Sequence, residues 1–126
     1  IRRIYSKIDS DRDNLVRVEE HFMDDAEIAV VSFGVASRPS MGAVLEARNN
    51  GIKVGLLRLI MIWPFPRKAI TALGKNVKRI FVPEMNLGQV SREIERFVDC
   101  DVIPISKIGG VSHRVSEIYS VVKRHS

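Results

Sequence analysis

The chain has 126 residues, and its hydrophobic fraction of 45% is enough to fill one compact core but not two. Its formal net charge of +5 would suit an acidic partner, but the basic residues are scattered and only 6% of residues are aromatic, so nucleic-acid binding is not expected. The longest apolar stretch, residues 54–65, contains Arg58 and is shorter than the roughly 20 residues that a membrane-spanning helix needs.

The first predicted element is a helix. Apolar residues at helical spacing open the chain: Ile1, Ile4, Tyr5 and Ile8. This spacing predicts a helix that reaches about Arg12. Residues 15–18 then predict a short strand, and the consecutive apolar residues within 27–33 predict a strand covered on both faces. Gly34 ends this second strand.

The remaining elements alternate between helices and strands. A helix is expected to begin at Ser37, since the following Pro39 is tolerated in a first helical turn, and residues 49–51 end it. Apolar runs predict further strands over 53–59, 78–82 and 102–105. Apolar stripes predict further helices that begin near residues 66, 87 and 111. Repeated strand–helix–strand units form a mainly parallel sheet with helices on both faces.

Ligands and partners of such sheets gather where the parallel strands end. In this chain that edge collects residues 32–37, 58–65, 84–89 and 106–110. Within the third segment, Asn86 can cap the next helix and Gln89 can complete a capping box. Glu84 remains at a strand end, and Gly88 stands in a first helical turn, where glycine costs about 1 kcal/mol against alanine.

Several patterns that resemble chemical sites have plainer explanations. The acidic positions of a calcium-binding EF-hand loop are matched by Asp9, Asp11, Asp13 and Glu20. Asn14 stands where that loop needs glycine, so a solvated helix end is preferred. The pair at Gly109 and Gly110 either holds an anion or forms a tight turn, and the turn is simpler.

The histidines and the cysteine do not form a catalytic group. The three histidines, at positions 21, 113 and 125, are spread along the chain, and a surface role is expected for His113. The single cysteine, Cys100, can neither close an internal disulfide nor supply the about four thiolates of an iron–sulfur cluster, and it is predicted to be a plain buried thiol.

Three phrases together resemble one family. They are residues 51–59 (Gly-Ile-Lys-Val-Gly-Leu-Leu-Arg-Leu), 63–66 (Trp-Pro-Phe-Pro) and 83–89 (Pro-Glu-Met-Asn-Leu-Gly-Gln). Together with residues 25–34 and the pair Gly109 and Gly110, these three segments span most of the chain. Their order and spacing resemble the alpha subunit of 2-oxoacid:ferredoxin oxidoreductases. The resemblance implies a domain like the carboxyl-terminal domain of transketolase. Such a domain is a three-layer α/β/α structure with a five-stranded, mostly parallel sheet, whose antiparallel edge strand would be residues 15–18.

The resemblance also implies a function for the complete enzyme, which decarboxylates a 2-oxoacid such as pyruvate or 2-oxoglutarate to an acyl-CoA and reduces ferredoxin. That enzyme uses thiamine diphosphate, magnesium, iron–sulfur clusters and coenzyme A. Residues 1–126 correspond to one domain, the second of a longer alpha subunit, and the chain opens on Ile1 as an excised portion would. This domain is expected to bind no cofactor or metal alone, to contain no catalytic residue and to be inactive in isolation.

The implied role is assembly. The expected partners are the amino-terminal domain of the alpha subunit, the beta subunit, gamma or delta subunits, and ferredoxin through the complete enzyme. The candidate interface residues lie in the strand-end segments: Arg58, Trp63, Pro64, Phe65, Pro66, Glu84, Asn86, Gly88, Gln89, Gly109 and Gly110. No export signal is recognised, so the cytoplasm is the expected compartment. The alternative is a free-standing flavodoxin-like nucleotide-binding or regulatory module.

Overall fold

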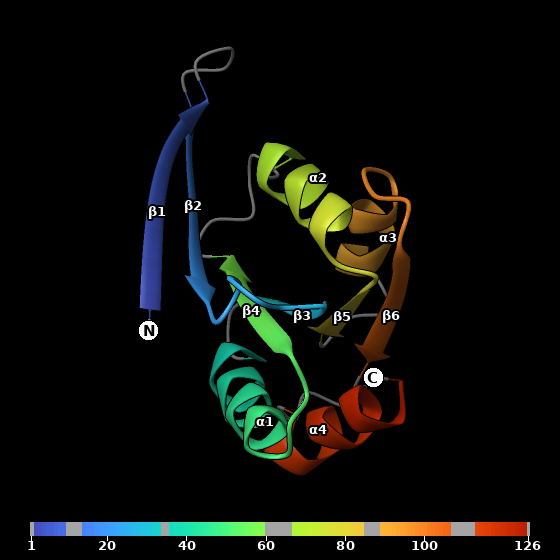
Figure 1. Ribbon diagram of the computed structural model, residues 1–126. Helices are drawn as coiled ribbons and strands as arrows, with labels where there is room; N and C mark the ends of the chain where they lie inside the picture. The colour runs from blue at the N-terminus through green and yellow to red at the C-terminus, as the bar shows by residue number, and fades with distance from the viewer. Residues whose placement is uncertain are drawn as a thin grey trace.

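The computed structural model describes residues 2–9, 14–33, 36–59, 67–84, 89–106 and 113–125, with the backbone alone at 2–9, 14–17, 89 and 106. Six strands form one sheet: β1 (Arg2–Asp9), β2 (Asn14–His21), β3 (Ile28–Phe33), β4 (Val54–Leu59), β5 (Arg79–Glu84) and β6 (Asp101–Ser106). The helices are α1 (Ser37–Asn49), α2 (Arg67–Asn76), α3 (Gln89–Glu95) and α4 (Val115–Arg124), as Figure 1 shows.

The described residues form three layers. Helices α1 and α4 cover one face of the sheet, and α2 and α3 cover the other (Figure 1). The strand order is β1-β2-β4-β3-β5-β6, in which β4, β3, β5 and β6 run parallel to one another. The predicted α/β class, with its mostly parallel sheet between helix layers, is therefore confirmed.

The apolar runs of the central strands are explained by burial on both faces. In β3, Ile28 and Val30 pack in the cluster under α1 and α4, whereas Ala29 and Val31 pack in the cluster under α2 and α3. Successive side chains of a strand point to opposite faces, so a strand covered on both sides must be apolar throughout. The same alternation places Phe81 of β5 in the first cluster.

The predicted opening helix is wrong, because residues 2–9 form strand β1. This strand pairs antiparallel with β2 along its whole length, with Arg2 opposite His21 and Asp9 opposite Asn14. Ile4 and Ile8 are four residues apart, a spacing that fits a helix and also the two-residue period of a strand. The pairing with β2 decides between them, since it supplies the backbone hydrogen bonds from outside the segment.

Strands β2 to β6 match the five-stranded mixed sheet that the family resemblance implies. The strand predicted at residues 15–18 lies within the longer β2, which is antiparallel to β4 as implied. β1 adds a sixth strand outside β2, so the edge position belongs to β1. The solvated helix end predicted for residues 9–20 is also wrong, because the described part of that segment lies in the two strands of this hairpin.

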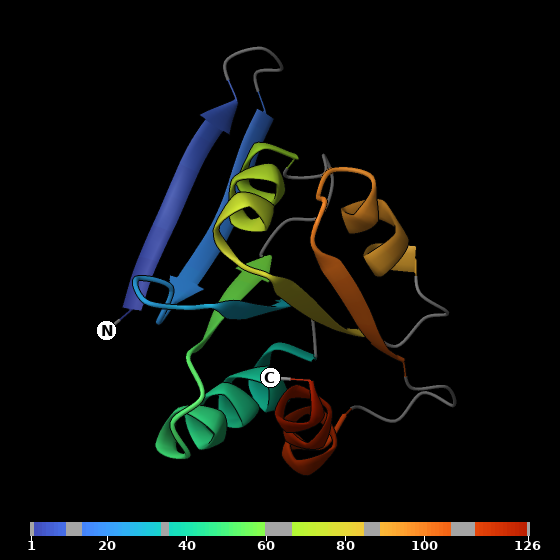
Figure 2. The same cartoon turned by 45° about the vertical axis from the view of Figure 1, so that its right-hand side comes forward.

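The hairpin extends beyond the rest of the sheet. β2 pairs with β4 only through residues 18–21, which lie opposite Leu56 to Leu59. Residues 14–17 pair with β1 alone. The segments 6–9 and 14–17 therefore form a two-stranded ribbon that projects past β4, as Figure 2 shows.

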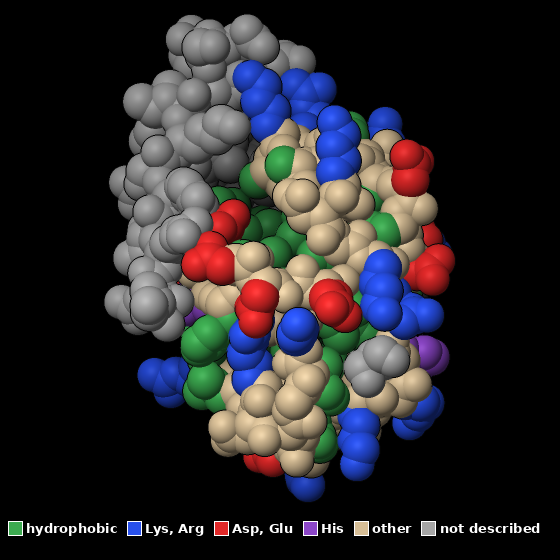
Figure 3. Space-filling view, viewed as in Figure 1, with side chains coloured by type: hydrophobic (Ala, Val, Ile, Leu, Met, Phe, Trp, Pro, Cys, Tyr) green, Lys and Arg blue, Asp and Glu red, His purple; other side chains and the backbone are tan. Residues whose placement is uncertain are grey.

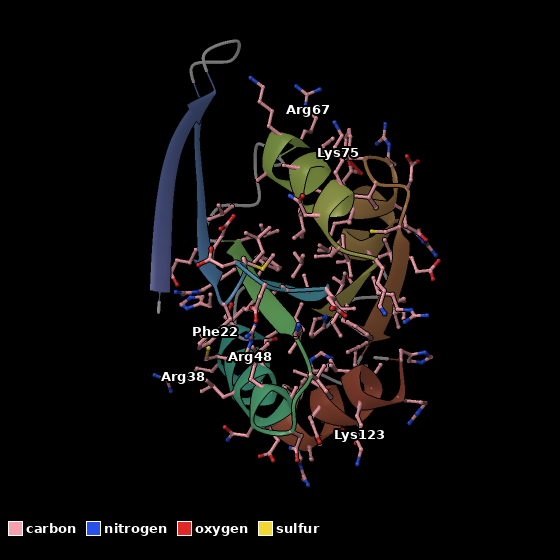
Figure 4. All side chains as sticks on the ribbon, in the orientation of Figure 1. Phe22, Arg38, Arg48, Arg67, Lys75 and Lys123 are labelled. Carbon is pink, nitrogen blue, oxygen red and sulfur yellow. The ribbon has the colours of Figure 1, made fainter. Side chains whose placement is uncertain are left out.

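The edge at which the parallel strands begin, called the amino edge here, is tied together by arginines. The Arg48 guanidinium of α1 donates hydrogen bonds to the Asp25 carboxylate (2.6 Å), to the Phe22 carbonyl (2.6 Å) and to the Val54 carbonyl (2.8 Å). Figure 4 shows Arg48 beside Phe22, whose ring centroid lies 5.3 Å from the guanidinium carbon. These bonds hold α1, β4 and the β2–β3 connection in one arrangement.

Candidate functional site

The ends of the parallel strands form the candidate site, called the carboxyl edge here. Phe33 at the end of β3 lies opposite Leu59 at the end of β4, and Glu84 at the end of β5 lies opposite Ser106 at the end of β6. The segments that follow these ends contain the candidate interface residues of the sequence. The structure thus places the strand ends that precede those segments at one edge of the sheet.

Glu84 is buried at this edge and holds helix α3. Its side chain is in the protein interior, and the residue is only 3% exposed. One carboxylate oxygen accepts a hydrogen bond from the backbone N–H of Val90 (2.8 Å), and the other accepts from the N–H of Ser91 (3.2 Å). A carboxylate at the first turn satisfies free N–H groups and opposes the positive end of the helix dipole. Glu84 therefore positions α3 against the end of β5.

Arg58 lies on the solvent side of a polar group near the end of β4. Its Nη1 is 3.3 Å from a carboxylate oxygen of Glu19, the residue opposite it on β2, and the same oxygen is 3.1 Å from Nε2 of His21. The Arg58 side chain is 44% exposed, whereas those of Glu19 and His21 are 14% and 4% exposed. The group therefore presents one oriented guanidinium to solvent above two largely buried partners.

The protonation of Glu19 follows from these contacts. Burial raises the pKa of the Glu19 carboxyl, but hydrogen bonds from His21 and Arg58, together with their charges, outweigh burial and leave that pKa below its usual value. The carboxylate therefore stays ionised at neutral pH and keeps Arg58 in place.

Two exposed apolar residues at this edge were not singled out from the sequence. Phe33, at the end of a strand predicted to be buried on both faces, is 38% exposed, and Val115, at the start of α4, is 40% exposed. The start of α4 also packs closely on α1, because a Cβ added at Gly42 would lie 2.7 Å from a methyl group of Val115. The sequence places Phe33 as the last residue of its predicted strand, before Gly34, and this position at the strand end is a signal for its exposure.

The surface role predicted for His113 is wrong, since this residue is 4% exposed. Its Nε2 lies 2.5 Å from the carbonyl oxygen of Ile105. A carbonyl only accepts, so Nε2 is the protonated nitrogen and donates this bond. The buried Nδ1 has no hydrogen-bond partner among the described residues. His113 is therefore held against Ile105 near the end of β6.

The other candidates from the sequence lie beyond what can be placed. Outside the described residues are Trp63, Pro64, Phe65, Pro66, Asn86, Gly88, Gly109 and Gly110, and Gln89 is described only as the first backbone position of α3. Cys100 is partly buried against the α2 and α3 cluster, as predicted for a plain thiol, and burial raises its pKa.

Two absences within the described ranges bear on the kind of site. Among the described residues, no group of three or more His, Cys, Asp and Glu side chains could hold a metal ion. None of the helices in these ranges is long and apolar enough to span a bilayer. On the face seen in Figure 3, lysine and arginine side chains are spread over several elements instead of forming one block.

The comparison with protein families gives one match over most of the chain. Residues 26–118 match the family model described as pyruvate:ferredoxin oxidoreductase core domain II. The 2-oxoglutarate synthase subunit KorA of Methanothermobacter marburgensis is 36% identical over 124 residues, which are 97% of this chain and 33% of that subunit. The chain therefore spans about a third of the length of this curated relative.

Solved structures agree with the fold. The 2-oxoglutarate:ferredoxin oxidoreductase from Magnetococcus marinus, with 2-oxoglutarate, coenzyme A and succinyl-CoA bound, is 27% identical with a TM-score of 0.72, over 79% of this chain and 18% of that chain. A split-gene transketolase, an inactive beta4 tetramer, is 12% identical with a TM-score of 0.67, over 80% of this chain and 38% of that chain. The second likeness supports the transketolase-like fold alone.

Proposed function

Because the chain belongs to the pyruvate:ferredoxin oxidoreductase core domain II family, we propose that it is a noncatalytic assembly domain of a 2-oxoacid:ferredoxin oxidoreductase. In this proposal the domain is the second domain of a longer alpha subunit, and its carboxyl edge docks onto neighbouring domains or subunits. The complete enzyme would decarboxylate a 2-oxoacid oxidatively, form an acyl-CoA and reduce ferredoxin. The family assignment disfavours a free-standing nucleotide-binding module.

The observation that carries this proposal is that the carboxyl edge has two exposed side chains, those of Phe33 and Arg58, and a buried carboxylate, that of Glu84, which holds α3 in place. Phe33 exposes an apolar ring and Arg58 an oriented guanidinium at the ends of adjacent strands. Aromatic residues, phenylalanine among them, and arginine are enriched at protein interfaces. Glu84 holds α3 beside them from within, and so contributes to the edge as a positioning residue.

The cofactors of the complete enzyme would be held by its other parts. The chain has one cysteine, which does not fit an iron–sulfur cluster held by about four thiolates. We assign thiamine diphosphate and its magnesium ion to the other domains and subunits of the complete enzyme. We assign coenzyme A to the complete enzyme as well, by analogy with the Magnetococcus marinus protein.

The substrate of the complete enzyme is a 2-oxoacid, and the matches name two of them. The family model names pyruvate, and the KorA relative names 2-oxoglutarate. The beta, gamma or delta subunits, ferredoxin and a cytoplasmic location are further parts of the proposal.

The test is a comparison of two exposed apolar residues. Phe33→Ser removes the ring at the carboxyl edge, and Leu45→Ser removes a side chain that is 46% exposed on α1. Burial of one such side chain is worth about 1.5–3 kcal/mol, which corresponds to a change in Kd of about tenfold or more. Titration calorimetry against the rest of the alpha subunit and the beta subunit should show that loss for Phe33→Ser and little change for Leu45→Ser. Equal affinities for the two variants would overturn the role of this edge.

A further inference from the structure

The exposed charged side chains differ between the two edges of the sheet. At the amino edge, basic side chains are mixed with exposed acidic ones, which include Asp24, Asp25, Glu27, Glu95, Asp99 and Asp101. The carboxyl edge comprises the last two residues of each parallel strand and the N-cap and first two residues of each helix. Among the described residues there, the exposed charged ones are all basic: Arg38, Arg58, Arg67, Lys68 and Arg114. These five residues are called the basic rim here.

The acidic residues near this edge do not offset the basic rim. No aspartate or glutamate occurs in the segments that join each parallel strand to the next helix: residues 34–36, 60–66, 85–88 and 107–114. The carboxylates of Glu19 and Glu84 are largely buried, and that of Glu117 accepts a hydrogen bond from the backbone N–H of Arg114 (2.7 Å). Residues 6–17 of the projecting hairpin contain as many basic as acidic residues, so they add no net charge.

The positions of Arg38 and Arg67 are unfavourable for the domain by itself. Arg38 is the second residue of α1 and Arg67 is the first of α2, and neither helix has an acidic residue in its first turn. The amino end of a helix carries a partial positive charge, which anions stabilise and cations destabilise. Figure 4 shows both arginine side chains at the outside of the fold. A carboxylate from another polypeptide would therefore compensate the arginine and the helix end together.

We propose that the carboxyl edge docks onto an acidic protein surface, whose aspartate and glutamate side chains pair with the basic rim. This proposal rests on the proposed function, and the acidic surface belongs to a neighbouring domain or subunit of the same assembly. The exposed side chains of Phe33 and Val115 fit an interface that combines apolar contacts with a charged margin. The low aromatic content of 6% favours a protein partner over single-stranded nucleic acid, which stacks its bases on aromatic side chains.

A double charge reversal tests the charge of the partner. Arg38→Glu with Arg67→Glu changes the basic rim, and Lys53→Glu with Lys78→Glu makes the same change in net charge at exposed positions of the amino edge. Surface plasmon resonance measures association of each variant with the rest of the alpha subunit and with the beta subunit. We expect the rim variant to associate about tenfold more slowly than the control variant at low salt, because complementary charges mainly raise the association rate. The difference should shrink as salt screens the exposed charges.

Thermal melting of the same variants separates docking from folding. Glutamates at positions 38 and 67 suit the amino ends of α1 and α2, so the rim variant should melt no lower than the unmodified chain. Slower association at an equal or higher melting temperature assigns the two arginines to the partner. A lower melting temperature with unchanged association would make them structural residues and would overturn the proposal.

The proposal and the proposed function fail in different ways. Equal association rates for the rim and control variants would overturn the acidic partner, although a loss of affinity in Phe33→Ser would still support docking by this edge. An unmodified chain that binds neither the rest of the alpha subunit nor the beta subunit would overturn both. A random-sequence DNA duplex is the remaining probe, and its binding at physiological salt would assign the basic rim to nucleic acid instead.

Discussion

The two edges of the parallel sheet use their charged residues differently. At the amino edge, Arg48 and Arg79 donate to backbone carbonyls, among them that of His125 at 2.6 Å from Arg79 Nη1, and so join distant segments. At the carboxyl edge, Arg58 has one ion-pair partner and is 44% exposed. Phe33, at the end of the neighbouring strand β3, is also exposed. The arginines of the amino edge therefore join parts of the fold, whereas Arg58 is one of the groups that our proposal assigns to a partner. Ligands of parallel sheets bind where the strands end.

The largest expected effect on stability is at the amino edge. Arg48→Lys replaces the planar fork by a single ammonium group, which cannot reach the Asp25 carboxylate and both carbonyls together. We expect the free energy of unfolding to fall by about 3 kcal/mol, because hydrogen bonds to charged groups contribute about 1.5–3 kcal/mol each and are not additive. Urea unfolding measures this loss. Arg38→Lys, on the exposed side of the same helix, is the control, and similar midpoints for the two variants would contradict the prediction.

The next effect concerns the buried carboxylate of the carboxyl edge. Glu84→Gln keeps the side-chain volume but removes the charge and one of the two acceptors that hold α3. We expect a loss of about 2 kcal/mol in the free energy of unfolding, together with faster amide exchange at Val90 and Ser91. Glu95→Gln, exposed at the end of the same helix, should leave both quantities nearly unchanged. Unchanged exchange at Val90 in the Glu84→Gln variant would show that the carboxylate does not hold this turn.

A smaller effect on stability is expected at Arg58. Arg58→Gln removes a partly exposed ion pair with Glu19, and such pairs contribute about 0–1 kcal/mol. Association with the other subunits should weaken more clearly than folding, since our proposal assigns the exposed guanidinium to the docking surface. Measuring both quantities for Arg58→Gln and for Arg92→Gln, which is exposed on α3, separates the two roles. A loss of stability without a loss of binding would make Arg58 a structural residue like those of the amino edge.

The smallest expected effect is a dependence on pH. The hydrogen bonds from Arg48 hold the pKa of the Asp25 carboxyl below its usual value. A depressed folded-state pKa contributes stability that is complete above the unfolded-state pKa of about 3.9 and is lost as pH falls through the lower folded-state value. Thermal melts should be recorded from neutral pH down to roughly pH 2–3. The melting temperature should fall less steeply with decreasing pH for Asp25→Asn than for the unmodified chain. Parallel curves would exclude the contribution of Asp25.

The elements buried on both faces were predictable from local sequence. The apolar runs within β3, β4 and β5 locate these central strands to within a few residues, because a strand between two helix layers must be apolar throughout. A short apolar run also locates the edge strand β6, which is only partly buried. The strand-end position of Glu84 followed from the same runs. Its partners did not, because nothing in the sequence indicates which backbone N–H groups a folded carboxylate reaches.

The sequence by itself determined the fold class and the parallel core. The tertiary structure alone decided that residues 2–9 form a strand, that His113 is buried and that Phe33 remains exposed. The physical reason is that periodicity reports burial along one segment. The pairing of residues 2–9 with β2 and the contact of His113 with Ile105 of β6 depend on residues outside the local segment. These contacts select one conformation where the local pattern allows two.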